Sequence, residues 1–179
     1  MGLFGKKKHS KMSSEDAAAL ALRSLDFIAE GVLVIDMGGM IKFANPAAAA
    51  MTGYGDPDNL TGLDYSLIVH LEDDKGTLIE PTQSALFTAI RLNQALQTRQ
   101  YGLVAAQSEK HIAIDLSCIP TGDERADRIV TFRDITTELA EEKEQAEFIS
   151  TASHEMRTPV ASIEGYLGLC LNPQTATIG

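Results

Sequence analysis

The stretch "EGVLVIDMGGMIKFANPAAAAMTGY", residues 30–54, decides the fold. Two runs rich in β-forming residues flank Gly38 and Gly39, which is the pattern of a β-hairpin. Asn45 can then cap a short helix in which Pro46 takes the first helical position, alanines follow and Gly53 ends the helix. We therefore expect two antiparallel strands that lead directly into a short helix.

Further elements are expected on both sides of this stretch. A helix over residues 13–30 precedes it, and "EPTQSALFTAIRLNQAL" (80–96) predicts another helix. Three later runs, residues 100–107, 110–120 and 128–135, predict strands; in the middle one, apolar and polar residues alternate. Five strands of this kind predict an antiparallel sheet with helices on one face, an α+β domain.

The C-terminal part predicts one long helix with an apolar seam. From residue 135 to 170, positions spaced alternately by four and three are apolar in nine of eleven cases. These positions, the apolar seam, are Ile135, Leu139, Ala146, Ile149, Met156, Val160, Ile163, Leu167 and Cys170, with Glu142 and Ser153 as the exceptions. Phe148 widens the stripe, which favours a helical bundle over a two-stranded coil. One chain supplies one such helix, so we expect a homodimer.

Three reactive side chains lie off this seam. His154, Glu155 and Thr158 take heptad positions b, c and f, which face water. The zinc pattern H-E-x-x-H needs a second histidine where Thr158 stands, so we expect no metal. An exposed imidazole can attack a phosphoryl group while a neighbouring carboxylate accepts its proton. Pro159 is expected to bend the helix next to this group.

Two known families share these motifs. Residues 30–54 and "IVTFRDIT" (129–136) resemble the PAS sensor family over about residues 25–137. "SHEMRTPVASIEGY" (153–166) resembles the H-box of the phosphoacceptor (HisKA) region of sensor histidine kinases. The second resemblance implies that His154 is the phosphoacceptor, Glu155 the general base and Thr158 the residue that positions water for phosphatase activity.

The resemblances also imply how a signal leaves the sensor. In the PAS family, the motif that stands here as Asp134, Ile135 and Thr136 ends the last strand and leads into an output helix. Together with the bend at Pro159, these residues are the expected route of signal transfer. The alternative is a PAS-type dimerisation or interaction module with no catalytic role, in which His154 is incidental.

The expected layout has five parts. They are a basic tail (1–14), an N-terminal helix (15–30), the PAS sensor domain (25–137), a signalling helix continuous with the first phosphoacceptor helix (138–171), and an inter-helix loop cut short (172–179). A second phosphoacceptor helix and an ATP-binding domain are missing from the sequence, and no P-loop motif is present. We therefore expect the first part of a longer kinase, inactive alone, with ATP and Mg²⁺ supplied through the missing domain.

Composition narrows the partners. A formal net charge of −10 excludes nucleic acid as the main partner. Residues 1–11 carry four lysines and no acid, which we interpret as a solvated tail without membrane contact. The chain shows neither an apolar run near 18 residues nor a secretory signal, so we expect a cytoplasmic protein. The expected partners are a second copy, an ATP-binding kinase domain and the receiver domain of a response regulator.

The ligand of the sensor stays open. Haem would need an axial histidine, and His70 in an acidic loop and His111 on an outward strand position are poor candidates. The photoactive flavin type needs a cysteine in a helix after the second strand, whereas Cys118 lies on a later strand. A small molecule or no ligand at all remains, and the sequence does not choose between them.

Overall fold

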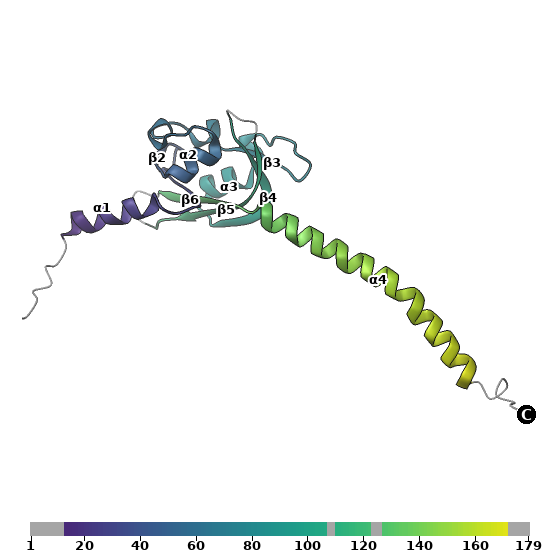
Figure 1. The fold of residues 1–179 in the computed structure, drawn as a ribbon. Helices are drawn as coiled ribbons and strands as arrows, with labels where there is room; N and C mark the ends of the chain where they lie inside the picture. Colours follow the sequence, from purple (N-terminus) through teal and green to yellow (C-terminus); the bar gives the residue numbers. More distant parts are fainter. Residues whose placement is uncertain (1–12, 107–109, 123–126, 172–179) are drawn as a thin grey trace, which may run out of the picture. The chain divides into compact units, whose positions relative to one another are not determined.

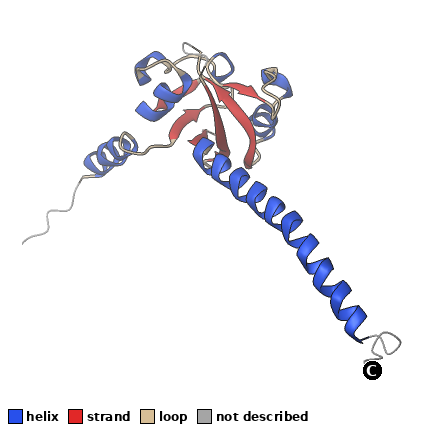
Figure 2. Cartoon of the chain, turned by 45° about the vertical axis from the view of Figure 1, so that its right-hand side comes forward, coloured by secondary structure: helices blue, strands red, loops and turns tan. Residues whose placement is uncertain are grey.

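The computed structural model describes residues 13–106, 110–122 and 127–171 (Figure 1). It divides into two compact units, Met1–Ile135 and Thr136–Gly179, which are described here separately. The predicted tail up to residue 12 and the predicted loop 172–179 lie outside the described residues. The first unit holds a sheet with helices, and the second consists of one long helix (Figure 2).

The elements follow one another in the expected order. They are α1 (Ser14–Leu25), β1 (Gly31–Ile35), β2 (Ile41–Ala44), α2 (Pro46–Thr52), the 3-10 turns η1 (Pro57–Asn59) and η2 (Tyr65–Leu67), β3 (His70–Glu72), η3 (Pro81–Gln83), α3 (Ala85–Leu92), β4 (Leu96–Val104), β5 (His111–Pro120), β6 (Arg128–Asp134) and α4 (Thr136–Leu171).

The sheet is antiparallel and has the strand order β2-β1-β6-β5-β4-β3. Its core lies between one face of the sheet and the helices α2 and α3, which contribute Ala48, Ala49, Leu86, Ala89 and Ile90 to the buried cluster. The alternation in β5 holds, because Ile112, Ile114, Leu116 and Cys118 are buried and their neighbours are not. The α+β class is confirmed.

Several boundaries differ from the prediction. The sheet has six strands and not five, because the three-residue β3 lies in a segment predicted to be irregular. β4 begins at Leu96 and not at residue 100. The helix predicted from residue 80 is split: Pro81 opens a separate turn, and the Ser84 side chain accepts from the Phe87 N–H to cap α3. α1 ends at Leu25, so the chain from there to β1 is a connection.

Asn45 holds four segments of this unit together. The residue is fully buried and caps α2, since its Oδ1 accepts from the Ala48 N–H at 2.9 Å. The same oxygen accepts from the Val32 N–H of β1 at 2.8 Å. Its Nδ2 donates to the carbonyls of Leu25, at the end of α1, and of Glu30, before β1, at 3.0 and 2.9 Å. One side chain therefore fixes the hairpin, α2 and the connection from α1.

Replacement of this residue tests its importance. Asn45→Ala leaves buried donors and acceptors without partners, and each such group costs about 1–3 kcal/mol. We expect a loss of roughly 3–5 kcal/mol in the free energy of unfolding, measured by urea denaturation. The exposed Asn59 in η1 is the matched control, and Asn59→Ala should change stability by less than about 0.5 kcal/mol. Equal losses in both variants would contradict the role assigned to Asn45.

Candidate functional site

The last strand of the sheet leads directly into the long helix. Asp134, the final residue of β6, lies opposite Ile114 of β5. The N–H of Ile135 donates to the Ala113 carbonyl at 2.8 Å, and the Ile135 side chain is fully buried. Thr136 is the first residue of α4. The three predicted signal-transfer residues therefore lie where the sheet ends; their role stays a prediction.

α4 is 36 residues long and exposes its apolar seam from Ile149 onward in this single chain. Ile135, the first predicted seam position, lies before the helix and is fully buried, so it does not belong to the exposed seam. Ile149, Met156, Val160, Ile163 and Leu167 are each about half exposed or more, from 49% to 64%. Apolar area of this extent in contact with water is unfavourable by about 25 cal/mol for each Å². A second helical surface that covers the seam would remove this cost.

The three candidate reactive residues lie together on α4 and are all exposed. Glu155 follows His154 directly, and Thr158 lies one helical turn beyond the histidine. Among the described residues, no side chain forms a hydrogen bond or ion pair with the His154 ring, so the imidazole is open to a reactant. The structure thus brings together an exposed imidazole, an adjacent carboxylate and a nearby hydroxyl.

Pro159 lies inside α4, which continues through it as one helix to Leu171 (Figure 1). A proline has no N–H, so the carbonyl of Glu155 lacks the donor that the residue four positions later would provide. The Ser162 hydroxyl donates to the Thr158 carbonyl at 3.0 Å, a backbone contact of the kind that often bends helices. The helix is therefore locally weakened just beyond the reactive residues.

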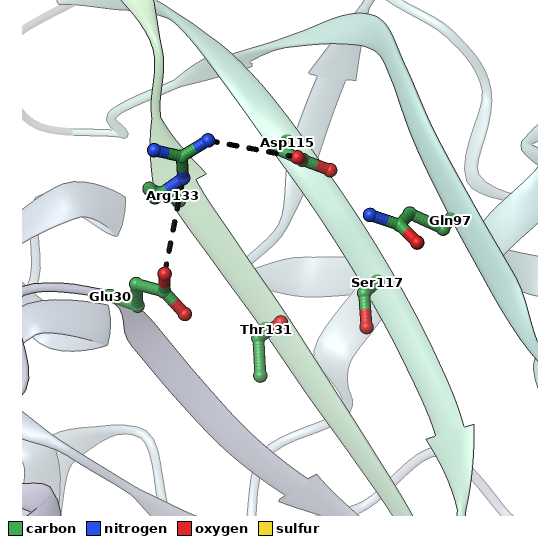
Figure 3. Close-up of a pocket in the computed structure, with 6 residues that line it drawn as sticks. All are labelled: Glu30, Gln97, Asp115, Ser117, Thr131 and Arg133. Atoms are coloured by element: carbon green, nitrogen blue, oxygen red, sulfur yellow. Dashed lines mark ion pairs between the residues drawn. The ribbon is translucent and has the colours of Figure 1, made fainter.

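A polar cavity of about 200 Å³ lies on the outward face of the sheet, in the first unit (Figure 3). Its lining residues are Glu30, Gln97, Asp115, Ser117, Thr131 and Arg133. Arg133 lies 3.9 Å from a carboxylate oxygen of Glu30 and 3.9 Å from one of Asp115. Sequence reasoning did not single out this group, although the alternation in β5 pointed to Asp115 and Ser117 as outward residues.

The two histidines considered for haem both lie on strands. His111 is exposed, as its strand position predicted, and its ring pairs with Glu72. The assignment of His70 to a loop was wrong, because the residue begins β3 and is half-buried.

Cys118 lies in the core, where burial raises the pKa of its thiol against the opposing effect of Arg128. Burial, followed by the charges of Asp64 and Cys118, also raises the pKa of the Tyr65 hydroxyl to about 12.

In residues 13–106, 110–122 and 127–171, no group of three histidine, cysteine or acidic side chains is placed to hold a metal ion. Over the same ranges, no helix combines the length and the apolar character needed to cross a bilayer.

Comparison with known families matches both units. Residues 20–86 match the family described as a PAS domain, and residues 144–177 match the family described as the His Kinase A (phospho-acceptor) domain. The second match contains His154, Glu155, Thr158 and Pro159.

Individual relatives agree with these matches. The chain is 28% identical over 140 residues to the sensor protein kinase WalK of Staphylococcus aureus, across 78% of this chain and 31% of the relative. For WalK from other strains of that organism the share is 21%, so this chain spans between a fifth and a third of the curated relatives it matches.

Solved structures support the fold of the first unit. A PAS domain from a two-component sensor histidine kinase superposes with a TM-score of 0.54 at 16% identity, over 68% of this chain and 99% of that chain. A PAS domain from Colwellia psychrerythraea gives a TM-score of 0.52 at 18% identity, over 68% and 99% of the two chains. The chain carries a PAS domain at residues 20–86, followed by a phospho-acceptor segment of the His Kinase A family at residues 144–177, and it is homologous to the sensor protein kinase WalK.

Proposed function

We propose that this chain is the sensory and phosphoacceptor part of a two-component kinase. In the reaction, an imidazole nitrogen of His154 attacks the γ-phosphorus of ATP, the bond to the leaving ADP oxygen breaks, and Glu155 accepts the imidazole proton. The phosphoryl group then passes to an aspartate of a receiver domain. The observation that carries the proposal is the open His154 ring beside Glu155, within the segment that matches the phospho-acceptor family.

ATP and Mg²⁺ are proposed to reach His154 on a separate ATP-binding domain. The metal ion supplies charge stabilisation for the transferring phosphoryl group. This chain contributes His154 as the nucleophile and Glu155 as the base, and the exposed His154 ring leaves room for ATP to approach. Because ATP and receiver domains are found in the cytosol, we also place this chain there.

The exposed apolar seam of α4 supports a homodimer. If two copies packed their seams against each other, both apolar surfaces would be removed from water. His154, at heptad position b, would stay exposed on the outside. The same seam would also serve a module that only dimerises, which is the competing function. Phosphorylation of His154 decides between the two.

The nucleophile is tested by phosphorylation in trans. The chain is mixed with a separately purified ATP-binding domain of a related kinase, and an acid-labile, base-stable phosphate is sought by mass spectrometry. We expect label on His154, its reduction to background in His154→Gln, and full label in the control His70→Gln. Label that persists in His154→Gln would refute the assignment; no label on a completed two-helix phosphoacceptor region would favour the dimerisation module.

Thr158 is tested separately from the nucleophile. Loss of its hydroxyl removes the group proposed to orient water, so Thr158→Ala should slow receiver dephosphorylation by about tenfold or more and leave phosphorylation of His154 within about twofold. Thr151 lies two turns earlier on the same face and is also exposed, which makes Thr151→Ala the control. A loss of both reactions in Thr158→Ala would indicate a structural effect.

The seam is tested by oligomeric state. Ile163→Glu places a carboxylate in the proposed interface and should weaken the dimer at least about tenfold, which is about 1.4 kcal/mol. Ala161 is exposed and lies off the seam, so Ala161→Glu should leave the dimer intact. Light scattering over a concentration series measures both, and equal behaviour of the two variants would argue against the seam as interface.

A further inference from the structure

A buried carboxylate and a histidine meet across the sheet, away from α4. Glu72 of β3 is only 7% exposed, yet one of its carboxylate oxygens lies 2.7 Å from Nδ1 of His111 on β5. β4 lies between these two strands in the sheet. The Glu72 side chain therefore crosses a whole strand to reach its partner.

Gly102 makes this crossing possible. It lies opposite Glu72 on one side and opposite Ala113 on the other. A Cβ atom at Gly102 would lie 2.5 Å from the Glu72 Oε1 and 2.6 Å from its Cγ, closer than side-chain atoms tolerate. A glycine inside a strand is otherwise unfavourable. Its presence at position 102 is explained by the Glu72 side chain, which occupies the space that a Cβ atom would need.

The bond between the two side chains depends on the charge of His111. When the ring carries its second proton, the contact with the Glu72 carboxylate is an ion pair as well as a hydrogen bond, and the Coulomb attraction adds to its strength. The His111 side chain is 58% exposed, so protons from solvent reach it freely. The contact is therefore stronger when His111 is protonated than when it is neutral.

Among the residues that the structure describes, few other charged groups share this part of the sheet. His70 of β3 and His111 lie in one cross-strand row on either side of Val104. Lys110 precedes His111 in the chain, and Asp115 lies further along β5, 3.9 Å from Arg133. From β6, Asp134 is the nearest charged residue, opposite Ile114.

The turn that follows β3 adds three charged residues. It carries Asp73, Asp74 and Lys75, and a Cβ atom at Gly76 would lie 3.9 Å from the Glu72 carboxylate. The backbone N–H groups of Thr77 and Lys75 hold the pKa of the Asp73 carboxyl below its usual value, so it stays ionised across neutral pH.

The contact lies close to the point where the sheet ends. His111 is two residues from Ala113, whose carbonyl accepts the Ile135 N–H at 2.8 Å. Ile114, the next residue, lies opposite Asp134. A change in how firmly the first residues of β5 are held therefore acts directly on the residues that precede α4.

We propose that Glu72, Gly102 and His111 form a proton-responsive clasp, through which the gain or loss of a proton on His111 changes the stability of the Ile135 anchor. The clasp itself stands on the contacts above. Only its effect on His154 rests on the proposed function.

The clasp is tested by amide hydrogen exchange of the whole chain at about pH 6 and about pH 8. After correction for intrinsic rates, the Ile135 amide should open about two- to fivefold less often at the lower pH, since a charged bond at an exposed ring adds modestly to stability. The Val34 amide in β1, remote in the sheet order, is the internal reference. His111→Gln and Gly102→Ala should both remove this dependence, and the control His70→Gln should keep it.

Either of two results would overturn the clasp: the dependence persists in His111→Gln, or it disappears in His70→Gln. His111→Gln decides the matter even if Gly102→Ala does not fold, because its side chain is largely exposed and glutamine resembles the neutral ring.

The link to output is read from the same proteins in the trans-phosphorylation assay. The ratio of His154 label in His111→Gln to that in the wild type should depart from one at about pH 6 and approach one at about pH 8. A ratio that does not change with pH refutes the link to output and leaves the exchange result standing. No label on the wild type at either pH, with the two-helix phosphoacceptor region completed, refutes the proposed function, and hydrogen exchange still decides the clasp.

Discussion

The first unit depends on one buried amide. The side-chain oxygen of Asn45 accepts two hydrogen bonds and its nitrogen donates two. All four partners are backbone groups, and without Asn45 each would need another hydrogen-bond partner. Buried polar groups without partners are costly, so this residue determines where α2 begins and where the chain from α1 meets β1.

A second constraint concerns the end of the sheet. Ile135 is buried and its N–H is held by β5, while Thr136 already belongs to a helix. A perturbation of β5 therefore acts on the residue before α4 through a single hydrogen bond. Arg133 and His111 both contact carboxylates on the outward face of the sheet, and both lie close to the residues that lead into α4.

The parts that sequence could predict are those with local signals. Gly38 and Gly39 mark the hairpin, and Asn45, Pro46 and Gly53 mark α2, with Gly53 in the left-handed conformation at φ 88°. The H-box is equally local, since its residues are neighbours in the chain. The spacing of His154, Glu155 and Thr158 was therefore enough to predict that they share one exposed helix face.

The parts that escaped prediction depend on partners far apart in sequence. β3 has three residues and exists because His70 to Glu72 pair with Val104 to Gly102. Glu72 and His111 are 39 positions apart, and only the sheet order brings them together. The sequence signal that could have indicated this contact is Gly102, because a glycine inside a run of strand formers often marks the close approach of another group.

The length of α4 has a mechanical consequence. His154 lies eighteen residues after Thr136, which at 1.5 Å for each residue is about 27 Å along the helix axis. Over such a distance, the effect of a bond made or broken at the start of α4 on His154 would have to be carried by movement of the helix as a whole. Each residue step turns a helix by about 100°, so even a fraction of one step would change which side of the helix a phosphoryl donor meets.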